Sequence, residues 1–305
     1  MKKGNSIIDY FTKLSISELK FYQKNGYLVK KNLIPANEIN RITHLVHRLV
    51  SKEKKRTSKI KNLGGTFDNP FVYNSNSAKK REILRLNNPH ERYSAFYKLA
   101  RHPRIIQIVK KILGGTVRFQ LGKLNFKLSD QKGGEIDWHQ DWGFYPHTND
   151  DLVTVGIYLE KCTEDNGPLK VIPGSHKGKV YSHHDHNNKF VGKINIKKEK
   201  INTKKSVSLT GDAGTVTFHH VRMVHGSGLN YKNNTRPLML YGYRAIDAWP
   251  VVDDGNTNPN IDFEKYNKEI IVGKKTLAPR IENVPMLIPL PKKRKNVSIY
   301  QLQRS

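Results

Sequence analysis

The 305-residue sequence contains a single cysteine, Cys162. An internal disulfide is therefore impossible, and a zinc site built from several thiolates is excluded. The sequence also lacks an apolar run of about 18 residues, the least that a transmembrane helix needs. The first residues include lysines but show neither an apolar core nor a small-residue cleavage site, so we expect no signal peptide. Together these absences predict a cytoplasmic protein without a membrane span.

Acidic residues are scarce as well: 26 aspartates and glutamates stand against 54 lysines and arginines, a formal net charge of +28. Such an excess is typical of proteins that bind nucleic acid or anionic lipid. It is equally typical of a lysine-rich proteome with A/T-rich codons. The lysine clusters at 51–61, 197–200 and 291–295 lie in expected loops or tails and are not interleaved with aromatic residues. We therefore do not expect nucleic acid as a partner, and we keep an acidic small-molecule substrate as a functional explanation of the charge.

The first third of the chain has mostly helical patterns. Ser15 and Glu18 form a capping box, apolar residues recur on one helical face over 36–50, and Gly114 follows the last helical turn. Helices are expected from Ser15 to near Gly26, over 36–50 and 91–100, and from Pro103 to Gly114. We expect residues 1–115 to form a helical part that packs on the rest of the protein.

After Gly115 the hydrophobic period changes to two, which indicates β-strands. Strands are expected at 117–121, 124–128, 152–160, 168–173, 205–209, 214–220 and 236–246, with a bulge near Gly122. Short strands separated by Gly, Pro, Asn and Asp turns predict an antiparallel sandwich or barrel rather than alternating βαβ units. We expect a β core over 116–250, a lid-like polar insert at 177–204 and a C-terminal extension at 251–305, all in one structural domain. The basic tail after about residue 285 is expected to be peripheral.

The stretch IDWHQDWGFYPH (136–147) places two metal-binding side chains two residues apart. In a strand, His139 and Asp141 project from the same face. Two histidines and one carboxylate form the facial triad of non-haem Fe(II) oxygenases, which leaves coordination positions open for substrates. His225 is the best third ligand, because Arg236 begins the next expected strand and could reach the same cavity. His219 and His220 remain alternatives for the third ligand. On spacing alone, a His-x-Asp pair that is solvated and binds no metal is as plausible as a metal triad.

A metal triad beside an arginine indicates a cosubstrate that chelates at one end and carries a carboxylate at the other, because arginine clamps carboxylates with two parallel hydrogen bonds. Three segments then carry a resemblance: WHQD (138–141), EDNGPLKVIPGSHKG (164–178) and HGSGLN with Arg236 (225–236). With these in this order, the chain resembles the phytanoyl-CoA dioxygenase family of Fe(II)- and 2-oxoglutarate-dependent oxygenases over roughly residues 17–250. The resemblance implies a double-stranded β-helix, or jelly roll, with helices packed outside. That fold agrees with the change of period at Gly115.

The resemblance also implies roles for particular residues. His139, Asp141 and His225 would bind iron; Arg236, with Ser227 beside it, would bind the distal carboxylate of 2-oxoglutarate; Arg85 would bind its other end; Asn125 and Lys127 would line the pocket. One departure is Ile157, which stands where some relatives have a tryptophan near 2-oxoglutarate. Related halogenases have a small residue in place of the acidic ligand, so Asp141 favours oxygenation.

The function expected from this resemblance is hydroxylation of a small organic, possibly anionic, substrate with Fe(II), 2-oxoglutarate and O2, releasing succinate and CO2. One alternative is a non-catalytic 2-oxoglutarate- or metal-binding regulatory protein on the same fold, which the intact ligand set disfavours. Another is an oxygenase that acts on nucleic acid, suggested only by the net charge. No motif selects the substrate or indicates the oligomeric state.

Overall fold

The computed structural model describes residues 14–58, 70–74, 81–131, 133–252, 262–293 and 298–304. The signal-peptide expectation rests on residues 1–15, of which only 14 and 15 lie within these ranges. Within them, no helix is both long and apolar enough to cross a membrane.

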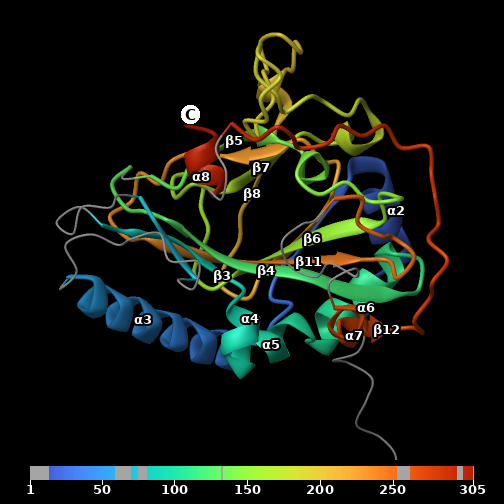
Figure 1. The fold of residues 1–305 in the computed structure, drawn as a ribbon. Coiled ribbons are helices and arrows are strands. Elements are labelled where there is room, and N and C mark those ends of the chain that lie inside the picture. The colour runs from blue at the N-terminus through green and yellow to red at the C-terminus, as the bar shows by residue number, and fades with distance from the viewer. Residues whose placement is uncertain are drawn as a thin grey trace, which may run out of the picture.

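Two antiparallel sheets face each other and form a sandwich (Figure 1). The larger sheet has the strand order β1-β9-β6-β11-β4-β3-β2, with β12 paired to β4. The smaller sheet has the order β5-β10-β7-β8. The larger sheet comprises β1 (Tyr27–Lys30), β2 (Phe71–Tyr73), β3 (Ile83–Asn87), β4 (Val117–Lys127), β6 (Leu152–Tyr158), β9 (Val216–His220), β11 (Arg236–Arg244) and β12 (Ile270–Val272), and the smaller one β5 (Ile136–His139), β7 (Leu169–Val171), β8 (Val207–Leu209) and β10 (His225–Ser227). The antiparallel sandwich expected from the sequence is confirmed.

Helices α3 to α6 lie along the outer face of the larger sheet (Figure 1). The helices are α2 (Ile16–Asn25), α3 (Ala36–Ser58), α4 (Pro89–Arg92), α5 (Ser94–Ala100), α6 (Pro103–Ile112), α7 (Phe263–Lys268) and α8 (Ile299–Leu302). The capping box at Ser15 and the left-handed Gly26 bound α2 as expected. The helix expected over 36–50 continues to Ser58, so the basic cluster at 51–61 begins on a helix and not in a loop.

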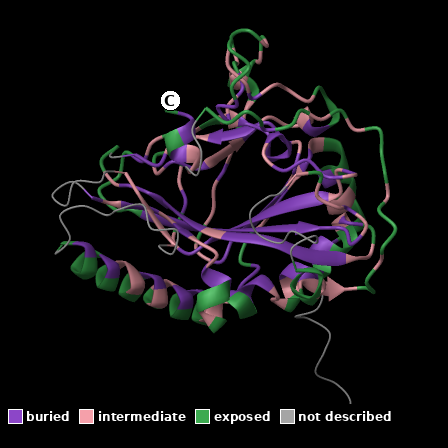
Figure 2. Ribbon diagram, in the orientation of Figure 1, coloured by how far each residue is buried: buried purple, intermediate pink, exposed green. Residues whose placement is uncertain are grey.

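The main hydrophobic core fills the space between these helices and the larger sheet, whose central strands β4, β6, β9 and β11 are almost wholly buried (Figure 2). Ile39 and Val46 of α3 and Ile105 of α6 belong to it, together with Val155 and Ile157 of β6. Because side chains alternate along a strand, the other face of each strand points toward the smaller sheet. Ile157 therefore faces the helices and not the space between the sheets.

A bulge in β4 sets which of its side chains face the space between the sheets. Gly242 of β11 pairs with Leu121 and Tyr243 pairs with Phe119, so Gln120 is the extra residue. The bulge expected near Gly122 thus lies two residues earlier in the chain. Beyond it, alternation places polar residues at consecutive inward positions of β4, and these residues line the site.

The insert at 177–204 crosses the outer side of the smaller sheet, and part of it projects beyond the sandwich (Figure 1). Its polar composition suggested a lid, but several of its side chains are buried, including Phe190, Val191 and Ile194. The backbone N–H of Ile194 donates to the Trp138 carbonyl of β5 at 2.8 Å. The described insert is therefore anchored to the strand that carries His139.

Candidate active site

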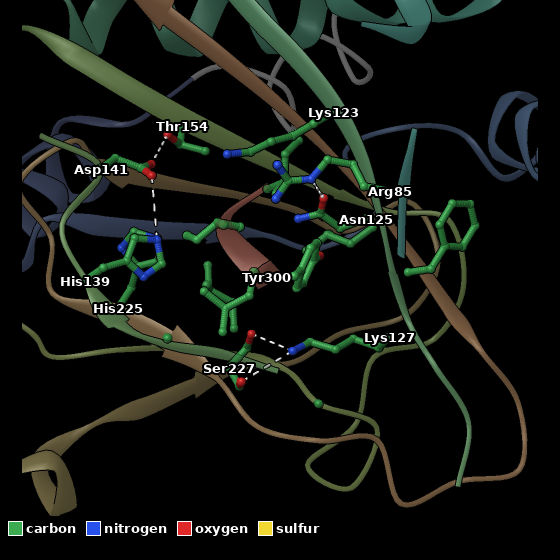
Figure 3. A pocket seen from close by; sticks show the side chains of 18 of the residues that line it. Arg85, Lys123, Asn125, Lys127, His139, Asp141, Thr154, His225, Ser227 and Tyr300 are labelled. Atoms are coloured by element: carbon green, nitrogen blue, oxygen red, sulfur yellow. Dashed lines mark hydrogen bonds and ion pairs between the residues drawn. The ribbon is translucent and has the colours of Figure 1, made fainter. Parts of the chain in front are cut away.

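A pocket lies between the two sheets and holds about 640 Å³ of space not filled by protein atoms, part of it continuous with solvent. Both sheets and helix α8 contribute to its wall. All eight site residues expected from the sequence line it: Arg85, Asn125, Lys127, His139, Asp141, His225, Ser227 and Arg236 (Figure 3). The sequence thus identified the residues of one cavity.

The three expected metal ligands meet at one end of this pocket. His225 of β10 pairs directly with His139 of β5, and opposed residues of antiparallel strands place their side chains next to each other. Strand β5 ends at His139, and the extended Gln140 continues the alternation, so Asp141 reaches the same point from a short 3-10 helix at Asp141–Gly143. Oδ1 of Asp141 lies 3.8 Å from Nε2 of His139 and 4.0 Å from Nε2 of His225. One ligand atom from each residue lies within 4.8 Å of the others.

Both histidines present a free Nε2 to this point. The Nδ1–H of His139 donates to the Asp137 carbonyl at 2.8 Å, and that of His225 donates to the Met223 carbonyl at 2.9 Å. These bonds fix the tautomer and leave the Nε2 lone pair for a metal. Burial lowers the pKa of His225 to about 4 and that of His139 well below its usual range, so both rings are neutral. Two neutral imidazoles and one carboxylate fit an Fe(II) ion.

The two alternative histidines are not part of this ligand group. His220 faces Asp150, with 3.9 Å between Nε2 and Oδ2. Nε2 of His219 lies 3.6 Å from Oδ2 of Asp141, the oxygen that does not face the histidine pair. Burial alone would raise the pKa of Asp141, but the contact with His219 and the charges of neighbouring groups hold that pKa well below its usual range. His219 therefore contacts the Asp141 carboxylate on the side away from His139 and His225.

Arg236 and Lys127 form the opposite end of the pocket. They pair across β11 and β4, and the Arg236 guanidinium donates to the carbonyls of Asn166 and Gly167 at 3.0 and 2.6 Å. Among the described residues, its buried Nη1 has no hydrogen-bond partner, which fits a role in binding a carboxylate. Lys127 donates to Ser227 Oγ at 2.7 Å. His225 and Arg236 thus face each other from opposite sheets, not from the adjacent strands that their spacing suggested.

Arg85 lies between these two ends. Strand β3, which the sequence pattern did not reveal, places Arg85 opposite Asn125, and the Arg85 Nε donates to Asn125 Oδ1 at 2.8 Å. On its other side, the guanidinium lies 5.0 Å from the ring centroid of Tyr300. Arg85 is therefore held by β4 and by the C-terminal helix.

The structure adds site residues that sequence reasoning missed. Lys123, Thr154 and His219 line the metal end, and Ile299 and Tyr300 of α8 close one side. Lys123 follows the same alternation as Asn125, which is the signal that could have revealed it. The expectation of a peripheral tail is wrong for its last turn, because Tyr300 is only 2% exposed.

One histidine of the insert contacts the segment between the metal ligands. His183 is buried, and its Nε2 accepts the N–H of Gln140 at 2.8 Å. Its Nδ1–H donates to the Tyr181 carbonyl at 2.9 Å. His183 therefore fixes the backbone between His139 and Asp141.

Comparison with known proteins places this site in a family. A model of the phytanoyl-CoA dioxygenase (PhyH) family matches residues 22–237. The chain belongs to the phytanoyl-CoA dioxygenase family. This member is 34% identical over 289 residues to a Stutzerimonas stutzeri protein named probable alpha-ketoglutarate-dependent hypophosphite dioxygenase, a match that covers 93% of this chain and 95% of the relative. It is 27% identical over 259 residues to human peroxisomal phytanoyl-CoA dioxygenase, covering 82% and 74% of the two chains.

Solved structures agree on the fold of this family member. EctD from S. alaskensis with 2-oxoglutarate and 5-hydroxyectoine superposes with a TM-score of 0.63 at 19% identity, covering 95% of this chain and 92% of that one. The expected jelly roll is thereby confirmed. Family membership and the His-Asp-His group also confirm that the protein is an Fe(II)- and 2-oxoglutarate-dependent oxygenase that acts on a small molecule.

Proposed function

We propose that this oxygenase hydroxylates a small anion, with hypophosphite as the first candidate substrate. The observation that supports this is the charge of the pocket: Arg85, Lys123, Lys127 and Arg236 line it, whereas Asp141 is its single carboxylate. Arginine stays protonated at physiological pH, so the two guanidinium groups attract anions whatever the state of Lys127, whose pKa burial lowers well below its usual range. The relative whose name includes hypophosphite aligns with almost the whole chain. The single cysteine supports a cytoplasmic location.

The proposed roles follow from position. His139, Asp141 and His225 would hold Fe(II), Arg236 with Ser227 would bind the distal carboxylate of 2-oxoglutarate, and Arg85 with Asn125 would lie near its other end. Iron, 2-oxoglutarate and O2 together supply the oxidising chemistry, in which one oxygen atom enters succinate and the other enters the substrate. With hypophosphite, one P–H bond becomes P–OH and the product is phosphite. Lys127 would donate to the Gly228 carbonyl and would orient the Ser227 hydroxyl beside Arg236.

The test is turnover with a defined panel. Protein with Fe(II) and 2-oxoglutarate is supplied with hypophosphite, L-proline, ectoine or a short carboxylate, and succinate is quantified. We expect hypophosphite to stimulate succinate formation and phosphite to appear in 31P NMR in equal amount. If only a different compound of the panel stimulates succinate formation, that compound is the substrate and hypophosphite is not. Bound 2-oxoglutarate without turnover on the panel would favour the regulatory alternative.

Two variants test the roles separately, with Mn(II) in place of iron and calorimetry as the readout. Asp141→Ala should abolish metal binding at the site, because two neutral imidazoles alone bind divalent ions weakly. Arg236→Met should keep the metal and weaken 2-oxoglutarate binding by about 1.5–3 kcal/mol, the usual worth of a hydrogen bond to a charged group. Unchanged 2-oxoglutarate affinity in Arg236→Met would contradict the assignment of Arg236.

A further inference from the structure

Lys123 is the pocket cation that the proposed cofactors do not use. It lies on β4 opposite Leu240 of β11, one inward position before Asn125 and two before Lys127. Its side chain extends into the metal end of the pocket, between Asp141 and Arg85 (Figure 3). Within the described part of the chain, its ammonium group has no hydrogen bond and no carboxylate oxygen within 4.0 Å.

The other three cations of the pocket are occupied. Lys127 donates to Ser227 and to backbone carbonyls, Arg85 donates to Asn125 and faces the Tyr300 ring, and Arg236 donates to two backbone carbonyls. In addition, the two carboxylates of 2-oxoglutarate are assigned above to Arg236 and Arg85. The ammonium group of Lys123 is thus the pocket cation to which no carboxylate of 2-oxoglutarate is assigned.

The ammonium group of Lys123 is partly desolvated. Burial lowers the pKa of Lys123 to about 8, and Arg85 adds to the effect, whereas the negative charge of Asp141 opposes it. The side chain is half-buried, so the ammonium group has lost part of its hydration without gaining a direct carboxylate partner in return. Such groups concentrate at functional sites, where a ligand supplies the missing partner.

We propose that Lys123 binds the negatively charged oxygen of the substrate and so places the substrate beside the metal. The ligand class is a small singly charged oxyanion, either a phosphinate such as hypophosphite or a short carboxylate. Lysine suits both, because an ammonium group is a compact point charge that does not demand the planar two-oxygen geometry that arginine matches. This inference rests on the proposed function, since it names the residue that recognises the anion.

The test separates substrate binding from cofactor binding. Lys123→Met keeps an unbranched side chain and removes the charge. Wild type and variant are loaded with Mn(II) and 2-oxoglutarate, which permits no turnover, and hypophosphite or acetate is then titrated by calorimetry. We expect the variant to bind the oxyanion at least about tenfold more weakly, while its affinity for 2-oxoglutarate changes less than about twofold. Lys204→Met, which removes an exposed lysine, controls for net charge and should bind like wild type.

Each outcome decides the proposal. Loss of hypophosphite binding, or of acetate binding, in Lys123→Met alone supports it and identifies the source of the oxyanion. Equal oxyanion affinity in wild type and Lys123→Met overturns it. Weaker 2-oxoglutarate binding in the variant also overturns it, because Lys123 would then belong to the cosubstrate site. Failure of the proposed function is distinct: no anion of the panel would then stimulate succinate formation, a readout that the binding comparison of wild type and Lys123→Met does not use.

Discussion

The two oxygens of Asp141 have different surroundings. Oδ1 faces the Nε2 atoms of His139 and His225, whereas Oδ2 accepts the Thr154 hydroxyl at 2.8 Å and faces His219. The carboxylate is therefore held so that a single oxygen points to the histidine pair. A one-oxygen ligand leaves more of the metal open than a chelating carboxylate does.

We predict that Thr154→Val weakens metal binding. Valine matches threonine in shape but cannot donate to Oδ2, so the carboxylate loses the contact that orients it. Loss of such a supporting contact usually costs about 10- to 100-fold in metal affinity. Calorimetric titration of Mn(II) measures the change, and Thr154→Ser, which keeps the hydroxyl, should stay close to wild type. Equal affinities for the valine and serine variants would show that the hydroxyl has no part in orienting Asp141.

At the scale of elements, the C-terminal helix α8 completes the pocket wall. The Gln303 side chain accepts the backbone N–H of Asp137 at 2.9 Å and donates to the Gly192 carbonyl at 2.7 Å, and Arg304 pairs with Glu135 at 2.8 Å. These contacts fasten α8 to the segment that carries the metal ligand of β5 and to the insert. A four-residue helix is not stable alone, so its position depends on them.

We predict that Tyr300→Ala lowers the affinity for 2-oxoglutarate. The substitution removes the ring against which the Arg85 guanidinium lies and admits water beside it, so Arg85 loses one of the two groups that position it. Contacts between a guanidinium and an aromatic ring contribute about 0.5–2 kcal/mol, which corresponds to a loss of about 2- to 30-fold. Tyr300→Phe keeps the ring and should bind like wild type. A loss of the same size in the phenylalanine variant would assign the effect to the hydroxyl instead.

The elements that the sequence predicted are those with a pattern of their own. Long amphipathic helices and alternating strands carry their period in consecutive residues, and α3 and β4 were found for that reason. Strand β3 and helix α8 are only five and four residues long, too short for a period to stand out, and they are held by pairing with β4 and by side-chain contacts far along the chain. Arg85 was therefore identified by resemblance alone, and Tyr300 was not identified at all.

At the scale of the whole molecule, the net charge of +28 raises the question of nucleic acid. We predict that the protein binds duplex DNA and RNA only at low ionic strength, because the expected substrate is a small anion held in a cavity and the lysine clusters of the sequence are not interleaved with aromatic residues. Filter binding between about 20 and 200 mM salt measures this. No complex should remain at about 150 mM salt, a concentration at which specific protein–nucleic-acid complexes persist. Sequence-selective binding at that salt would restore the alternative of a nucleic-acid oxygenase.

Acid should unfold the protein because several histidines are buried in the neutral form. Burial lowers the pKa of His90 and His183 to about 4 and that of His220 to about 3. Between pH 6.5 and these values the unfolded chain takes up protons that the folded chain excludes, so the free energy of unfolding falls as pH falls. Each such histidine contributes a slope approaching about 1.4 kcal/mol per pH unit.

His90 allows this to be tested away from the pocket. Its ring packs edge-on against Phe119, with ring centroids 4.6 Å apart, and its buried Nδ1 has no hydrogen-bond partner among the described residues. We predict that His90→Phe, measured by denaturant unfolding of metal-free protein at pH 7.5 and 4.5, reduces the loss of stability between these pH values by on the order of 2 kcal/mol. The variant removes the group that must stay neutral, whereas His44→Gln, at an exposed position of α3, should leave the loss as it is in wild type. If His90→Phe shows the wild-type dependence, the acid sensitivity arises from the histidines around the site and not from the helical side of the sheet.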